Sequence, residues 1–306
     1  MKSLETELAR ARGLDESVLA DAIESIGFEC TRCGACCKGY DPERDVPSTA
    51  EAEANGDKTE ADSGTDTDSG TDTDSGTDTD SGTDTDGDAC HTEREPHTAT
   101  VFPDEIRRLQ SRAGDRTADA ADGETTTESD SAYDWRDIAR PMPYGLESGE
   151  NGLKGETFEW ALQTTDCGDC TFYTESADGT GGCSVHADRP LICQTYPFSI
   201  DLAGTSQPMG AQVDRVALSE QREADDVDQT TLQAHECEGL GRDISREDAV
   251  ALAAALKERA VRELTEAIAV RDRYEPVPQS TRAANGGVVV HDSEGAKTID
   301  GNRINR

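Results

Sequence analysis

The sequence predicts an α+β fold, a small and irregular domain with helices near both ends and a disordered acidic insertion. Apolar residues recur at helical spacing over residues 1–27 and again after Ser245, which predicts the two helical ends. Short apolar runs bounded by turn residues lie between them and predict strands. The insertion, at residues 41–97, contains too few apolar side chains to bury a core.

Residues 1–27 predict one or two amphipathic helices with acidic residues throughout. We expect no secretory signal peptide, because this region has no apolar stretch of the required kind. No run of about 18 apolar residues occurs in the chain, so we expect no membrane span. These observations predict a cytoplasmic protein. The apolar stripe of the helical region consists of Leu4, Leu8, Leu14, Leu19, Ile23 and Ile26.

The insertion is dominated by a repeat. The hexad SGTDTD occurs four times without change from Ser63 to Asp86, and residues 41–100 contain 19 acidic residues against three basic ones. Identical short polar repeats cannot bury a core. We therefore predict a disordered tether with no folded role.

The rest of the chain mixes strand-like and helical segments. Thr98–Phe102 predicts a short strand, followed by a helix that Pro103 opens with acidic residues in its first turn. Both tryptophans lie in the stretches WRDIARPMPYG and GETFEWALQTTD, which predict core strands. Ser245 and Asp248 make a capping-box-like start to a helix of more than about 20 residues. The last part of the chain contains VVVHDSEGAKTID, which can form a hairpin.

These composition shifts divide the chain into four parts. The first part holds the N-terminal helices and the first cysteine cluster, and the insertion is the second. The third is the remainder of a cysteine-rich domain, which ends in the long helix, and the fourth is a tail. The predicted ranges are 1–40, 41–97, 98–275 and 276–306.

The net charge of −36 argues against partners that need a basic surface. Asp and Glu number 65 against 29 basic residues, of which only six are lysine. This bias is typical of a halophilic cytoplasm, where a Debye length of about 3 Å or less lets a dense acidic surface repel itself little. Nucleic acids and anionic membranes bind basic faces, so we expect neither as a partner. The alternative interpretation is a disordered acidic protein.

Clustered cysteines are the strongest chemical signal in the chain. Cys30, Cys33 and Cys36 follow a C-x2-C-x2-C spacing, in which one turn of backbone can aim three sulfurs at a common centre. In a reducing cytoplasm such clusters bind metal more often than they form disulfides. Thiolates are ligands of zinc and of iron–sulfur clusters. Adjacent residues usually project in different directions, so we expect Cys37 to reach a second metal or another edge of a cluster.

Downstream cysteines can supply the remaining ligands. Cys167 and Cys170 form a second C-x2-C pair. Two tetrahedral centres need eight ligands, and metal ligation of this kind contributes on the order of 10 kcal/mol per structural zinc site. We therefore predict a domain that is nucleated by metal. The eight cysteines are Cys30, Cys33, Cys36, Cys37, Cys170, Cys183, Cys193 and Cys237.

Four stretches of the chain resemble a known family. They are CTRCGACC, CTFY, GGCSVHADRPLICQTYPF and the later HECEGLG. Together they are similar to the YkgJ-type cysteine-cluster proteins, whose CxxCxxCC domain is regarded as a zinc- or iron-chelating module and is often labelled an Fe–S oxidoreductase. The resemblance covers residues 28–40 and about 98–240. It implies that the eight cysteines named above are the metal ligands, and it extends to Arg189 and Pro190.

Further residues near the motif are candidates for the site. Cys167 lies outside the common pattern, and Cys90 has no counterpart in it. His186 can act as a ligand, although family members often carry tyrosine there. Arg189 can donate hydrogen bonds to metal-bound thiolates, or form an ordinary salt bridge. His235 is expected to be a surface residue.

The sequence thus predicts a metal-binding protein that holds zinc or an iron–sulfur cluster through cysteine thiolates, as a redox protein. The alternatives are a structural-zinc or metal-handling module without catalytic activity, and an enzyme related to flagellin lysine N-methylases, which resemble the family through the same cluster. No glycine-rich loop after a strand supports an adenosylmethionine site. No Ser–His–Asp order, Walker loop or HExxH helix occurs, so neither catalytic residues nor a substrate can be assigned.

Overall fold

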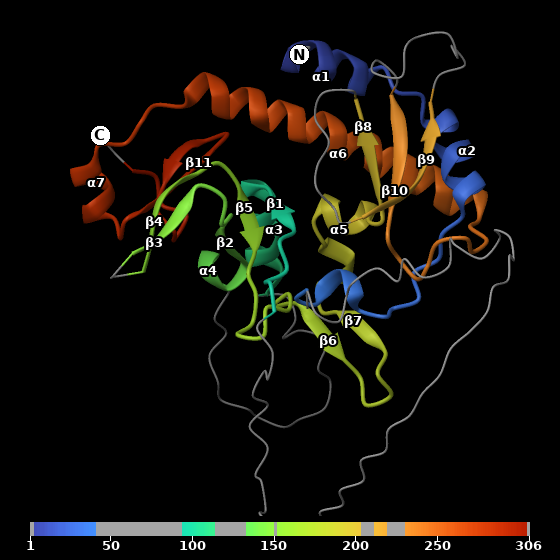
Figure 1. Cartoon of the computed structure of the whole chain (residues 1–306), viewed down its shortest axis with the longest axis horizontal. Coiled ribbons are helices and arrows are strands. Elements are labelled where there is room, and N and C mark those ends of the chain that lie inside the picture. Colours follow the sequence, from blue (N-terminus) through green and yellow to red (C-terminus); the bar gives the residue numbers. More distant parts are fainter. Residues whose placement is uncertain are drawn as a thin grey trace, which may run out of the picture.

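The computed structural model describes residues 3–40, 94–113, 133–149, 152–202, 211–218 and 230–304. Helices and small sheets combine in these parts, which confirms the α+β prediction (Figure 1). The hexad repeat and Cys90 lie outside the described residues. None of the described helices combines the length and the apolarity that a membrane span requires.

The predicted N-terminal helices are present as α1 (Leu4–Arg12) and α2 (Glu16–Ile26). The Asp15 carboxylate caps α2, since it accepts a hydrogen bond from the backbone N–H two residues later at 2.8 Å. Leu19 and Ile23 of α2 are fully buried in one apolar cluster with residues of α6 and β10. Burying each such side chain contributes about 1.5–3 kcal/mol, so this stripe holds α2 in place.

The long helix α6 (Arg246–Arg273) begins where the capping pattern predicts. Ser245 Oγ accepts a hydrogen bond from the N–H of Asp248 at 3.1 Å, and the helix runs for 28 residues. α6 contacts α1, α2 and α5 (Leu191–Thr195), and Figure 1 shows it along the upper side of the molecule. Its buried side chains recur every three to four residues: Ala249, Ala253, Leu256, Arg259, Ala260 and Leu264.

Two three-stranded antiparallel sheets carry most of the core. One has the order β1-β5-β2 and lies beside α3 (Pro103–Ala113) and α4 (Trp135–Ile138), and the other has the order β8-β10-β9. The first predicted strand is therefore shorter than Thr98–Phe102. The bounds are β1 Thr100–Val101, β2 Ala139–Pro141, β5 Trp160–Leu162, β8 Phe198–Asp201, β9 Gln212–Ala217 and β10 Thr231–His235.

The C-terminal part joins a mixed sheet. β11 (Val288–Asp292) and β12 (Gly295–Lys297) form an antiparallel pair, and β11 also pairs in parallel with β4 (Gly152–Thr157). β3 (Leu146–Gly149) completes the order β12-β11-β4-β3, and α7 (Gln279–Ala284) precedes β11. The tail is thus more than a hairpin, because its central strand is hydrogen-bonded to a strand more than a hundred residues earlier.

The two ends of the insertion lie side by side. The N–H of Tyr40 donates to the carbonyl of Glu95 at 2.8 Å, and the N–H of Glu95 donates back to Tyr40 at the same distance. The N–H of His97 donates to the carbonyl of Gly168 at 2.8 Å, so residues 94–97 belong to the folded part. The chain therefore leaves and re-enters the domain at one point, next to both cysteine regions.

Candidate metal centre

The segment that precedes the first cysteines is paired with the segment that follows Cys237. The N–H of Glu29 donates to the carbonyl of Gly239 at 3.0 Å. A Cβ at position 239 would lie 2.2 Å from the Glu29 carbonyl oxygen, so only glycine permits this approach. The Cys-x-Gly sequence thus serves to bring Cys237 close to the turn that begins at Cys30.

The CGACC turn folds around the ring of Tyr173. Gly34 has a φ of +79°, and a Cβ there would lie 2.4 Å from the tyrosine hydroxyl oxygen. Residues Ala35–Cys37 follow as one 3₁₀ turn (η1). In this turn the Sγ atoms of Cys36 and Cys37 lie 3.8 Å apart. The expectation that these adjacent side chains project apart is wrong, because the turn brings both thiols to the same region.

Backbone hydrogen bonds connect this turn to the second cysteine region. The N–H of Cys170 donates to the carbonyl of Cys37 at 2.7 Å, and the N–H of Gly181 donates to the carbonyl of Arg32 at 2.8 Å. The hairpin that follows consists of β6 (Tyr173–Glu175) and β7 (Gly181–Cys183). Two segments about 130 residues apart in the chain thus form one local structure.

Cys193 is placed by the short helix α5. Glu105 of α3 is buried, and one carboxylate oxygen accepts the N–H of Leu191 at 2.9 Å while the other accepts the N–H of Phe102 at 3.0 Å. Burial raises the pKa of Glu105, and these two hydrogen bonds favour its ionised form. The carboxylate therefore connects α3 to the first turn of α5, which carries the thiol two residues further on.

Five of the free cysteines line one cavity of about 270 Å³. They come from four structural elements, and the adjoining side chains belong to the apolar cluster around β1 and β5. Arg189, His97 and Tyr196 also contribute to the lining. The five cysteines are Cys36, Cys37, Cys170, Cys183 and Cys193.

Burial makes the thiols of Cys170, Cys183 and Cys193 weaker acids than a free cysteine, because it raises their pKa. It raises the pKa of Cys170 to about 11 and is also the main cause that raises the pKa of Cys193. For Cys36 the hydrogen bond with Cys37 raises the pKa first and burial second. The positive charge of the Arg189 guanidinium lowers the pKa of Cys36 and of Cys193. A metal cation among these sulfurs would replace the protons and hold the thiolate forms.

A second group of thiols adjoins the cavity. The pKa of Cys237 is raised by burial first and then by the charges of Cys33, Cys36 and Cys30. Tyr196 lies between the two groups, and its hydroxyl donates to the carbonyl of the residue before Cys237. We call Cys37, Cys170, Cys183 and Cys193 the inner group and Cys30, Cys33 and Cys237 the outer group. The charge of Cys36 raises the pKa of cysteines in both groups.

Comparison with known proteins finds one family. Residues 116–238 match a family model described as a putative zinc- or iron-chelating domain, CxxCxxCC. The resemblance to the CxxCxxCC family is confirmed. The match covers less than half of the chain and includes five cysteines, while the first cluster lies before it. No curated protein and no solved structure matches the chain.

The cysteines of the cavity fit a thiophilic metal by donor type and by one distance. An ion with metal–sulfur bonds of about 2.3 Å separates two tetrahedral ligand sulfurs by about 3.8 Å, the spacing found for Cys36 and Cys37. Within the described ranges, no three His, Cys, Asp or Glu side chains meet closely enough to hold an ion. Binding would therefore require further sulfurs of the two groups to draw together.

The remaining candidate residues differ in whether they line the cavity. Arg189 lines it, whereas His186 does not. Cys167 is disulfide-bonded, so its sulfur is not a free thiol, and Cys90 lies outside the described residues. His235 was expected at the surface, and this is wrong, since it is buried and hydrogen-bonded at 2.8 Å to a serine hydroxyl of β8.

Several residues that shape the site escaped sequence reasoning. From the sequence, Glu105 is an ordinary acidic residue in the first turn of a helix. Tyr173 is likewise an ordinary strand residue. Tyr196 also lines the cavity, although in the sequence it is an ordinary aromatic residue after the last cysteine of the second region. His97 also lines it, and burial together with Arg140 lowers its pKa to about 4. Only Gly34, which lies against Tyr173, and Gly239, which follows Cys237, could have been recognised from the sequence. A glycine within a motif indicates that another part of the backbone or a side chain approaches closely there.

Proposed function

We propose that the protein binds zinc or iron through cysteine thiolates. The ligands are the cysteines of the inner group and the outer group, together with Cys36. The observation that supports this best is the meeting of five free cysteines from four structural elements in one cavity. An uncharged cysteine packs as a small apolar side chain, but five of them at one cavity also offer a thiophilic cation its ligands, and thiolates need a cation when buried. The match to a zinc- or iron-chelating family agrees with this assignment.

Arg189 would moderate the charge of such a centre. Four thiolates carry a charge of −4, which exceeds that of a divalent ion, and the guanidinium of Arg189 favours the thiolate forms of Cys36, Cys183 and Cys193. The lysine side chain nearest the turn, Lys38, is already bound to Glu175 at 2.6 Å. Arg189 is therefore the positioning residue that we assign to the inner group.

The same arrangement supports a structural role for the metal. The inner group joins the CGACC turn, the Cys170 loop, the β6–β7 hairpin and α5, whose cysteines all belong to or pack against one apolar cluster. Ligation would tie these four elements together with a free energy on the order of 10 kcal/mol per zinc site. If the metal is iron, the same thiolates would make a redox centre.

Metal analysis of the full chain purified without oxygen tests the proposal. We expect at least one tightly held ion per chain, and Cys193→Ser and Cys237→Ser should each lower the metal content. Iron with sulfide and a broad absorption near about 400 nm would identify a redox-active cluster, and colourless zinc a structural centre. Wild-type protein that holds neither metal, with all thiols reactive or oxidised, would refute chelation.

A further inference from the structure

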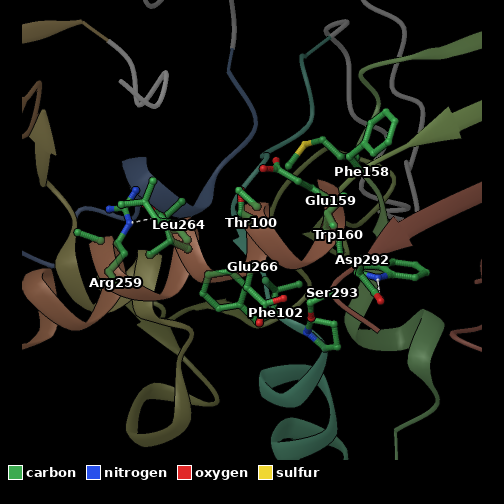
Figure 2. A pocket seen from close by; sticks show the side chains of 18 of the residues that line it. Thr100, Phe102, Phe158, Glu159, Trp160, Arg259, Leu264, Glu266, Asp292 and Ser293 are labelled. Atoms are coloured by element: carbon green, nitrogen blue, oxygen red, sulfur yellow. Dashed lines mark hydrogen bonds and ion pairs between the residues drawn. The ribbon is translucent and has the colours of Figure 1, made fainter. Parts of the chain in front are cut away.

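A second and larger cavity, of about 760 Å³, lies between α6 and the strands β1 and β5 (Figure 2). Leu256, Ala260 and Leu264 of α6 line one side, and Val101 and Trp160 line another. This volume and a mostly apolar wall are typical of sites for small molecules, which occupy about 300–1,000 Å³. Thr98 and Ile192 line both this cavity and the thiol cavity, so the two share a wall.

Aromatic side chains surround part of the opening. Phe158 and Tyr274 have ring centroids 5.4 Å apart and remain 46% and 41% exposed, and Tyr144 is 67% exposed. Exposed aromatic rings grouped at one cavity are a costly use of apolar surface in a chain with only 4% aromatic residues. The faces of such rings attract cations through their quadrupole.

The charged groups of the cavity wall are paired, with one exception. Arg259 Nε donates to Glu263 at 2.7 Å, and Arg271 pairs with Glu5 at 2.7 Å. The Glu159 carboxyl, in contrast, makes no hydrogen bond or ion pair with any residue that the structure describes. The residue is exposed at the cavity, where partial loss of solvation, with Glu263 second, raises its pKa. In Figure 2 Glu159 lies beside Phe158, away from Arg259.

The remaining acidic groups of the wall are likewise occupied. Asp292 accepts a hydrogen bond from Trp160 Nε1 at 2.9 Å and pairs with Lys297 at 2.8 Å. Glu266 accepts from Arg262 Nε at 3.4 Å. A ligand that enters the cavity therefore meets apolar side chains, aromatic faces and one unpaired carboxyl, but no unpaired cation among the described residues.

We propose that this cavity binds a small organic cation, a protonated amine on an apolar body, with the ammonium beside Glu159 and the aromatic rim. The apolar body would replace water along α6 and β5, which is favourable by about 25 cal/mol per Å² of apolar surface buried. The positive charge would hold Glu159 in its ionised form. An anionic ligand of the same shape would have no unpaired cation to bind, because Arg259 and Arg271 already form ion pairs. The charge of the ligand therefore decides which ligand binds more tightly.

Calorimetric titration of the full chain with three probes of one shape tests this site. The probes are 4-phenylbutylamine, 4-phenylbutanol and 4-phenylbutyrate, which share the apolar body and differ in charge. We expect the amine to bind at least about tenfold more tightly than the other two. Equal affinities for the three probes, or no binding by any of them, would overturn the proposal.

Three variants locate the binding. Glu159→Gln should remove the preference for the amine, while Glu147→Gln, the same charge change at an exposed position of β3, should preserve it. Ala267→Trp places a large ring at the exposed edge of the cavity and should abolish binding of all probes. A preference that survives Glu159→Gln, or binding that survives Ala267→Trp in folded protein, contradicts the assignment. Metal content should not change in these variants, so this test is independent of the thiol centre.

Discussion

The backbone N–H of Cys170 donates to the carbonyl oxygen of Cys37 at 2.7 Å. This hydrogen bond joins the last cysteine of the first cluster to a cysteine of the second region, across the whole acidic insertion. Because the carbonyl of Cys37 is held in place, the orientation of the CGACC turn toward the cavity is set by the second region. The two cysteine regions therefore act as one structural unit.

Cys167 and Cys170 offer a matched pair for the ligand assignment. Cys170 is a buried free thiol in the inner group, whereas Cys167 is disulfide-bonded. We expect Cys170→Ser to lower the bound metal and Cys167→Ser to leave it unchanged, as measured by elemental analysis after anaerobic purification. The reverse result would show that the CxxC spacing, and not the cavity, marks the ligands.

Gly239→Ala should disturb the outer group selectively. A Cβ at this position would lie 2.2 Å from the carbonyl oxygen of Glu29, so the segment carrying Cys237 must move away from Cys30. We expect a loss of about 1–3 kcal/mol in the free energy of unfolding and a partial loss of metal. Gly13→Ala is the control, because its nearest atoms lie at 3.4 Å, and it should change neither quantity.

Glu105→Gln tests the carboxylate that holds α5. Glutamine keeps one acceptor oxygen but replaces the other with a donor, which would face a backbone N–H in a buried place. We expect destabilisation of about 1–3 kcal/mol in denaturant titration, with weaker metal retention by Cys193. The exposed substitution Glu147→Gln should have no comparable effect. Unchanged stability in Glu105→Gln would mean that α5 is positioned by packing alone.

His97 should make the fold sensitive to acid. Burial, and then Arg140, lower its pKa to about 4 in the folded state, compared with about 6.5 in an unfolded chain. Its contribution to stability is therefore complete above about pH 6.5 and is lost as the pH falls toward 4. The free energy of unfolding of His97→Asn should fall less than that of wild type between pH 7 and pH 4, by about 1–3 kcal/mol. Parallel pH profiles of the two proteins would contradict this.

Removal of residues 55–88 tests the role of the repeat. Tyr40 and Glu95 are joined by two backbone hydrogen bonds at the ends of the insertion, so we expect the folded part not to depend on the length between them. Loop-closure free energy varies only logarithmically with length, so thermal and denaturant stability should change by less than about 1 kcal/mol. Metal content should be unchanged, and its loss would place part of the site in the removed segment.

The sequence by itself determined the local elements and the chemical class of the site. Helical spacing of apolar residues identified α1, α2 and α6, and Ser245 with Asp248 marked the start of α6, because these signals arise from interactions between near neighbours in the chain. The spacing of the cysteines indicated thiolate chemistry, which the family match supports.

Only the tertiary structure decided which residues meet. The pairing of β11 with β4, the contact of Glu105 with α5, and the approach of Gly239 to Glu29 join segments that are far apart in the chain. No local pattern encodes such contacts, since they depend on how several packed elements close together. The same reason explains the wrong expectations for His235, for the direction of Cys37, and for Trp135–Ile138, which forms helix α4 where a strand was predicted. A residue's burial and direction follow from the elements around it, and residue type alone does not set them.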